Sequence, residues 1–141
     1  QAVGKVMTTG QLVDLQKEVD RVYVDPALIE YAVRMVTATR RPQDFGLKEI
    51  QPYIQYGASP RASINLILTA RALAFVRSRD YVLPQDVQDM ALDVMRHRLV
   101  LSYEAMSDGL SSDAVLQQII ECVPVPSQPL QTHVNFSVPA N

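Results

Sequence analysis

Arg61 occupies a position that is unfavourable for a cation. It follows Ser59 and Pro60 in the segment QYGASPRASINLILTA, residues 55–70. A serine before a proline predicts a helix start, because the hydroxyl can cap free backbone N–H groups and proline fits the first helical position. Arg61 would then lie at the positive end of the helix dipole, which disfavours a cation by roughly 0.3–1 kcal/mol. The sequence therefore predicts an anion beside Arg61.

Two kinds of anion could lie beside Arg61. In a structural role, Arg61 would pair with a carboxylate of the preceding loop, Asp44 or Glu49. In a functional role it would contact an anion that comes from outside this loop. The residues by themselves leave both alternatives open.

The remaining side chains that could do chemistry favour structural roles. Asp86, Asp89 and Asp93 could hold a divalent cation, but carboxylates spread over two helical turns diverge, so we expect a solvated face. His97 lies four residues after Asp93, and the two could form an acid–base pair or half of a metal site, although a surface hydrogen bond near a helix end is favoured. The single cysteine, Cys122, and two distant histidines lack the spacing of zinc ligands. We therefore expect no metal site.

The charge balance argues against broad binding to nucleic acid or to anionic membranes. Thirteen basic and fifteen acidic residues produce a net charge of −2 and a pI near 5.6. Several aromatic and basic residues could form a nucleic-acid surface, but at this charge we expect them to serve packing and loop anchoring: Tyr53, Tyr56, Tyr81, Arg40 and Arg41.

The chain also lacks the glycine-rich patterns that bind nucleotide phosphates. Neither G-x-x-x-x-G-K-[S/T] nor G-x-G-x-x-G occurs, and the five glycines are scattered. One arginine cannot both position a nucleophilic water and neutralise a triphosphate. We therefore expect this chain alone to show no ATPase activity and to hold neither ATP nor Mg²⁺.

Length and composition indicate one domain with a real core. The chain has 141 residues, of which 48% are hydrophobic. A single cysteine excludes an internal disulfide and is typical of a reducing compartment. No apolar run is long enough to cross a bilayer and no signal peptide is recognisable, so we expect a cytoplasmic protein without a membrane span. The chain begins with Gln1 and is expected to be a piece of a longer protein.

Hydrophobic periodicity predicts an all-α compact bundle of about five helices. Capping and proline signals place these helices at about 8–22, 26–40, 59–78, 84–98 and 112–122. Residues 40–58 carry prolines and glycines, so we expect a long loop there, with a short helical turn near 47–50. We expect the domain to span 1–124, followed by a proline-rich tail or linker at 125–141.

The third predicted helix is apolar on nearly all sides, so we expect it to lie at the centre of the bundle. Its principal apolar stripe comprises Ile64, Ile67, Leu68, Ala72 and Phe75. The first predicted helix is amphipathic, with a narrower stripe formed by Leu12, Leu15, Val19 and Val22.

Three segments together resemble the C-terminal lid of the MoxR family of AAA+ ATPases. They are VYVDPALIEYAVRMVTATR, YGASPRASINLILTARALAFVRSRDYVLPQDV and HRL, and the resemblance runs from about Leu12 to Val123. The combination of GASPRA, A-x-A, R-D-Y-V-x-P-x-D-V and HR is specific, although pieces recur in the lids of magnesium-chelatase ATPase subunits. The chain departs from the family at Ser78, where glycine is frequent, and at Leu83, where a capping Thr or Ser is common.

This resemblance implies a parent protein with an N-terminal P-loop core that holds ATP and Mg²⁺ beneath a helical lid. Arg61 matches the family's second-sensor arginine, which reaches the γ-phosphate, and Gly57, Ser59 and Pro60 would shape the helix start. The parent is expected to hydrolyse ATP, to assemble as a homo-oligomeric ring, often a hexamer, and to remodel clients in a chaperone-like manner. Partners with von Willebrand factor A domains are also implied.

We therefore interpret the chain as the lid of an ATPase, a nucleotide-sensing module rather than a complete enzyme. Two alternatives stay open from the sequence. One is the lid of a magnesium-chelatase-like ATPase subunit. The other is a stand-alone helical module for protein interaction or DNA binding, in which the third and fourth helices imitate a helix-turn-helix.

Overall fold

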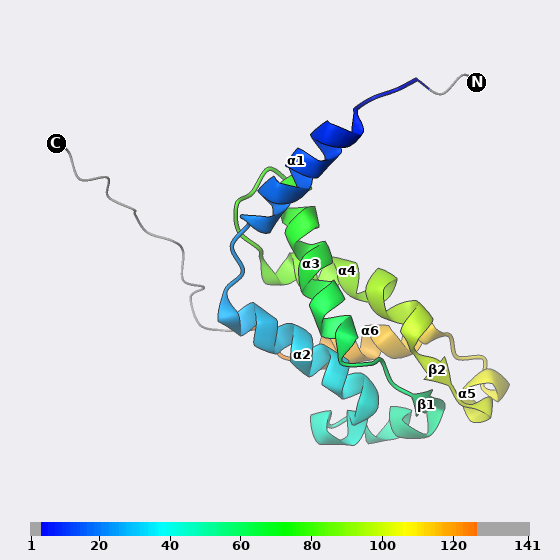
Figure 1. Cartoon of the computed structure of the whole chain (residues 1–141). Coiled ribbons are helices and arrows are strands. Elements are labelled where there is room, and N and C mark those ends of the chain that lie inside the picture. The colour runs from blue at the N-terminus through cyan, green and yellow to red at the C-terminus, as the bar shows by residue number, and fades with distance from the viewer. Residues whose placement is uncertain (1–3, 127–141) are drawn as a thin grey trace.

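The computed structural model describes residues 4–126 of the chain. Its longer helices are α1 (Thr9–Asp20), α2 (Pro26–Arg40), α3 (Arg61–Val76), α4 (Pro84–Met95) and α6 (Ser112–Cys122) (Figure 1). The shorter elements are the 3-10 helices η1 (Pro42–Phe45), η2 (Lys48–Tyr53) and η3 (Arg96–Arg98), the strands β1 (Ile54–Tyr56) and β2 (Val100–Leu101), and the helix α5 (Tyr103–Ser107). The expected all-α bundle is confirmed, with one small sheet added to it.

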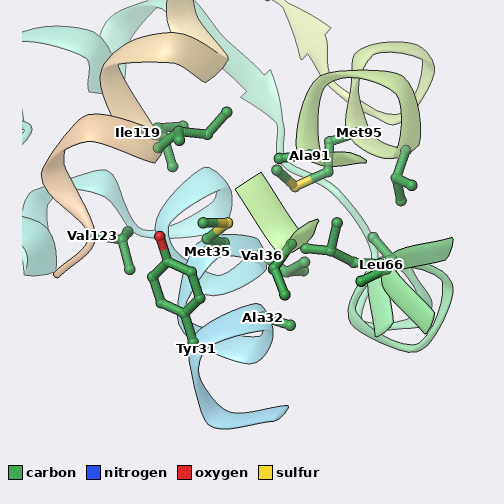
Figure 2. Close-up of a cluster of buried hydrophobic side chains, with 14 of the residues drawn as sticks. Tyr31, Ala32, Met35, Val36, Leu66, Ala91, Met95, Ile119 and Val123 are labelled. Atoms are coloured by element: carbon green, nitrogen blue, oxygen red, sulfur yellow. The ribbon is translucent and has the colours of Figure 1, made fainter. Parts of the chain in front are cut away.

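The hydrophobic core lies between α2, α3, α4 and α6. α3 packs against both α4 and α2, and α6 contacts α2 and α4. Figure 2 shows side chains from these four helices gathered in one cluster, among them Met35, Leu66, Met95 and Ile119, all of which are fully buried. α2 and α3 are therefore packed on one shared core.

Three helix starts lie where the capping signals predicted them. Thr8 caps α1. Asp25 caps α2 by accepting a 2.8 Å hydrogen bond from the amide two residues on, with Pro26 at the first helical position. Pro84 opens α4. These are local interactions between neighbouring residues, which is why the sequence alone predicts them.

α3 buries a face that overlaps only partly with the predicted stripe: Ile67 and Phe75 pack against the core, whereas Ile64 and Leu68 are exposed. Its fully buried residues form one row along the helix, and three of the four are alanines: Ala62, Leu66, Ala70 and Ala74. Ile64 and Leu68, from the expected core stripe, are 60% and 49% exposed. The small side chains on the buried face let neighbouring helices approach α3 closely, and a closely packed interface of this kind is favourable. α3 is nevertheless central, as expected, because it contacts both α2 and α4.

α1 extends away from the bundle beyond the end of α3 (Figure 1). No residue of α1 is buried, and Leu12 and Leu15 are 47% and 38% exposed. Val22, which follows the helix and completes its apolar stripe, is buried. The predicted stripe therefore exists, but only its C-terminal end reaches the core.

The region between α2 and α3 contains more regular structure than the long loop that we predicted. η1 and η2 occupy most of it, and η2 confirms the short helical turn expected there. β1 then pairs antiparallel with β2, which lies far along the chain. Local sequence could not reveal this pairing, because it depends on where α4 brings β2. Residues 127–141, most of the expected tail, lie outside the described residues.

Candidate functional site

The segment from Gly57 to Arg61 connects β1 to α3. α3 begins at Arg61, and Pro60 before it already has helical backbone angles, φ −54° and ψ −27°. The Ser59 carbonyl accepts a 2.8 Å hydrogen bond from the Ala62 amide, but no side chain caps the helix. The predicted position of the helix start is thus confirmed to within one turn. The predicted hydroxyl cap at Ser59 is wrong, because the Ala62 amide donates to the Ser59 backbone carbonyl and not to the Ser59 hydroxyl.

Thr39, near the end of α2, holds this segment in place. Its hydroxyl donates to the Val36 carbonyl at 2.7 Å and accepts from the Ala58 amide at 2.9 Å. Thr39 and Ala58 are both fully buried. The two bonds therefore satisfy groups that burial has removed from water. Helical periodicity places Thr39 on the inner face of α2, but its bond to Ala58 can be seen only in the folded structure.

Gly57 allows the segment to approach the end of α2. A Cβ at this position would lie 2.3 Å from the Thr39 carbonyl oxygen and 2.7 Å from the Cγ of Arg40. Both distances are far inside van der Waals contact, and the first involves backbone that cannot move away without disturbing α2. Gly57 is therefore required by close packing, and it shapes the path of the chain into α3.

Arg61 is exposed and has no acidic partner among residues 4–126. The loop carboxylates that could have neutralised it, Asp44 and Glu49, form no ion pair with it in this part of the chain. The first turn of α3 contains no acidic residue either. A cation therefore stands unpaired at the positive end of a long helix, where it can meet an external anion.

A second charged cluster joins the end of α3 to the start of α4. The fully buried Asp86 carboxylate accepts hydrogen bonds from Arg77 at 2.8 Å, from Arg79 at 2.7 and 2.5 Å, and from the Leu83 amide at 2.8 Å. Burial alone would raise the pKa of Asp86, but the hydrogen bonds from Arg79, the Leu83 amide and Arg77 outweigh it and lower the pKa. The expected solvated position of Asp86 is wrong, because the turn after α3 folds two arginines over it.

Of the other candidate side chains, Asp89 shares Arg77 with this cluster, whereas Asp93 and His97 form no bond to it. Asp89 pairs with Arg77 at 2.6 Å, and Asp93 pairs with Arg96 at 3.1 Å. His97 is exposed in η3. Within the described part of the chain, no group of three His, Cys, Asp or Glu side chains could hold a metal ion. The aspartates of α4 are thus bound by arginines: Asp86 and Asp89 share Arg77, and Asp93 pairs with Arg96.

The sequence matches a known domain family and several curated proteins. Residues 46–119, more than half of the chain, match the AAA lid domain. The chain is 42% identical over 135 residues to Chaperone MoxR1 of Mycobacterium tuberculosis, which covers 96% of this chain and 36% of that protein. It is 35% identical over 111 residues to Protein MoxR of Paracoccus denitrificans, covering 74% of this chain and 32% of that protein.

The fold has a counterpart among solved structures. The crystal structure of a candidate ATPase from Cytophaga hutchinsonii resembles it with a TM-score of 0.85 and 38% identity, covering 89% of this chain and 38% of that one. The chain thus spans about a third of the length of these relatives. The domain match, the MoxR relatives and the shared helical fold agree, and the chain belongs to the AAA lid domain family as the lid of a MoxR-family AAA+ ATPase.

Proposed function

We propose that this lid closes over ATP bound by a P-loop core of the same polypeptide and senses the γ-phosphate through Arg61. The observation that carries the proposal is the unpaired state of Arg61 within residues 4–126, at the positive end of α3. An external anion stabilises a cation in such a place, and a phosphate also suits the helix N-terminus. The match to the AAA lid domain and the MoxR relatives support the ATPase setting.

In this mechanism ATP and Mg²⁺, when bound in the core, supply the phosphoryl group and its activation. This chain presents Arg61 at a defined place, because Thr39 and Gly57 attach the start of α3 to the end of α2. A guanidinium can donate two parallel hydrogen bonds to phosphate oxygens, and such bonds strengthen as negative charge develops in phosphoryl transfer. Because the contact requires the γ-phosphate, the lid would respond to the difference between ATP and ADP.

The wider setting belongs to the same proposal. We place the lid in a homo-oligomeric ring, a hexamer, that remodels client complexes with the help of a partner carrying a von Willebrand factor A domain. The name Chaperone MoxR1 of the mycobacterial relative supports a remodelling role. We propose a cytoplasmic location. Among the described residues, no helix combines the length and the apolar character needed to cross a bilayer.

A DNA-binding role for α3 and α4 has less support. In a helix-turn-helix, the second helix would enter the major groove. α4 instead exposes Asp89 and Asp93, whose carboxylates would be repelled by backbone phosphates. A net charge of −2 supplies no compensating attraction. These charges weigh against DNA binding by α4.

The proposal is tested by Arg61→Ala in a full-length protein that carries this lid. ATP turnover should fall at least ten-fold, roughly 1.4 kcal/mol in activation free energy. The lid should stay folded, because Arg61 makes no ion pair within residues 4–126 and its removal takes a cation away from the positive end of α3. The measurements are the steady-state ATPase rate and the melting temperature of the same variant.

Arg61→Lys is the matched control. Lysine keeps the charge but loses the planar group that donates two parallel hydrogen bonds. The ATP turnover of Arg61→Lys should therefore lie between that of Arg61→Ala and that of the unchanged protein. Normal turnover in Arg61→Ala would contradict the proposal. A lowered melting temperature with normal turnover would instead assign Arg61 a structural role.

A further inference from the structure

A cavity of about 560 Å³ lies between the C-terminal half of α3 and the segment that joins α1 to α2. Arg71 of α3 lines it, together with residues 20–24, Asp80 and Tyr81. The Nε atom of Arg71 is buried and has no hydrogen-bond acceptor among the residues that the structure describes. Neither aspartate of the cavity, Asp20 or Asp80, forms an ion pair with Arg71 within residues 4–126. The Arg71 guanidinium has therefore lost part of its hydration without gaining an acidic partner from this part of the chain.

The cavity lies at the end of an uncovered apolar stripe on α1, the helix that extends away from the bundle (Figure 1). Leu12 and Leu15 are 47% and 38% exposed, and Val22, which continues the stripe, lines the cavity. Two ion pairs lie on α1 away from this stripe: Asp14 with Lys17 and Glu18 with Arg21. A helix of 12 residues is marginal in water by itself, and no residue of α1 is buried. This amphipathic pattern indicates that a further surface covers the stripe in the full-length protein.

A polypeptide segment suits this surface better than a small anion does. Asp20 and Asp80 bring two negative charges to the cavity, so they would repel a free anion that Arg71 attracts. A carboxylate on a segment that also covers Leu12 and Leu15 would be held beside Arg71 by the apolar contacts. The chain spans about a third of the length of its relatives, so the rest of such a protein can supply this segment at a high effective concentration.

We propose that Arg71 and the apolar stripe of α1 form a docking surface for the P-loop core of the same polypeptide, in which an Asp or Glu of the core accepts hydrogen bonds from the Arg71 guanidinium. The inference rests on the proposed function, because it takes the P-loop core from it. Arg71 follows Arg61 by ten residues, which is about 15 Å along α3. The docking surface is therefore separate from the helix start that would face the nucleotide. It attaches the lid to the core at a second place.

The first experiment identifies the carboxylate in a full-length protein that carries this lid, without nucleotide. The variant is Arg71→Lys, because a carbodiimide joins an amine, but not a guanidinium, to a carboxylate in contact with it. Mass spectrometry should find the amine at position 71 bonded to an Asp or Glu of the core. Arg41→Lys is the matched control and should yield no such product, because Arg41 is exposed and forms no ion pair within residues 4–126. The absence of a product with the core, or a product with Asp20 or Asp80 alone, would overturn the inference.

Hydrogen exchange of the α1 amides in the same full-length protein measures the docking itself. Arg71→Met keeps an aliphatic stem but removes the charge, so exchange in α1 should become about ten-fold faster, as expected for the loss of a charge-assisted hydrogen bond. Leu12→Ala should also speed exchange, whereas Val13→Ala should not, because Val13 is 48% exposed but lies off the stripe. Exchange in α2 and α4 should stay unchanged. Equal effects of the two alanine substitutions, or unchanged exchange in Arg71→Met, would overturn the inference.

Isotope labelling separates the core of the same polypeptide from a second copy of the protein. In a mixture of labelled and unlabelled protein, the crosslink should join peptides that carry the same label. Products that combine the two labels would overturn the inference, since a neighbouring copy would then supply the carboxylate.

The ATPase assay of Arg61→Ala reports on the proposed function independently of these measurements. A crosslink to the core together with normal turnover in Arg61→Ala would support the docking surface and reject the sensing role. Lost turnover in Arg61→Ala without a crosslink to the core would support the sensing role and overturn the docking surface.

Discussion

At the scale of single residues, the hydroxyl of Thr39 decides how firmly the Gly57–Arg61 segment is held. Thr39→Val keeps the shape of the side chain but leaves the buried Ala58 amide without an acceptor. An unsatisfied buried donor costs about 1–3 kcal/mol, so the free energy of unfolding should fall by that amount. Urea denaturation of the chain measures the change.

Thr37 supplies the control for this prediction. Its hydroxyl also donates to a carbonyl one helical turn earlier, at 2.8 Å from the oxygen of Val33, but it makes no bond to the segment before α3. Thr37→Val should therefore change the free energy of unfolding by less than about 0.5 kcal/mol. Thr39→Ser, which keeps the hydroxyl, should be more stable than Thr39→Val. Equal effects of the two valine substitutions would show that the bond to Ala58 contributes nothing.

At the scale of the elements, the end of α3 is closed by a residue in a strained conformation. Ser78 has a φ of +57°. Its amide donates to the Phe75 carbonyl at 2.9 Å, and the Arg79 amide donates to the Ala74 carbonyl at 2.9 Å. This pair of bonds is the Schellman motif, in which glycine is preferred at the left-handed position. The motif explains why the family resemblance places glycine where this chain has serine.

Ser78→Gly should stabilise the domain. A residue with a side chain is destabilised by roughly 1–2 kcal/mol in the left-handed region, and glycine removes this cost. Glycine also loses more conformational freedom on folding than serine does, which cancels part of the gain. We expect a gain of about 0.5–1 kcal/mol in the free energy of unfolding, measured by thermal or urea denaturation. Ser63→Gly, the same change inside α3, should lower stability instead. A loss of stability in Ser78→Gly would refute this account of the turn.

At the scale of the whole molecule, the Asp86 cluster links stability to pH. Hydrogen bonds from Arg79, the Leu83 amide and Arg77 outweigh the opposing effect of burial, so the pKa of Asp86 is lowered in the folded state. A lowered pKa contributes stability that is present above the unfolded value, about 3.9 for aspartate, and is lost as the pH falls toward the folded value. The free energy of unfolding should therefore decrease as the pH falls below about 4.

Asp86→Asn tests this linkage through the stability of the fold. It removes the negative charge and one of the two acceptor oxygens that two arginines share, so at pH 7 the free energy of unfolding should fall by about 3 kcal/mol. The decrease in stability at acid pH should become shallower, because one titrating group is gone. Asp113→Asn is the control: Asp113 pairs with Arg96 at the surface, and solvent screens such a pair, so the loss should be much smaller. An unchanged acid profile in Asp86→Asn would contradict the role assigned to Asp86.

The sequence by itself determined the features that depend on neighbouring residues. The starts of α1, α2 and α4 follow from Thr8, Asp25 with Pro26, and Pro84, because caps and prolines act within one turn. The helical class follows from periodicity. The GASPRA segment placed Arg61 near a helix start, since that signal also lies within a few residues.

Only the tertiary structure decided features that depend on residues far apart in the chain. Periodicity favoured the larger side chains of α3 for the core, but close packing against α2 and α4 selected the row with Ala62 and Leu66 and left Ile64 exposed. The Thr39–Ala58 bond and the burial of Asp86 likewise required the chain to turn back on itself. Ion pairing also depends on which residues the fold brings together. Among residues 4–126, the fold brings no carboxylate into an ion pair with Arg61. Local propensity acts within a helical turn, whereas burial and charge pairing act between elements, and for that reason the sequence predicted the helix at Arg61 but not its surroundings.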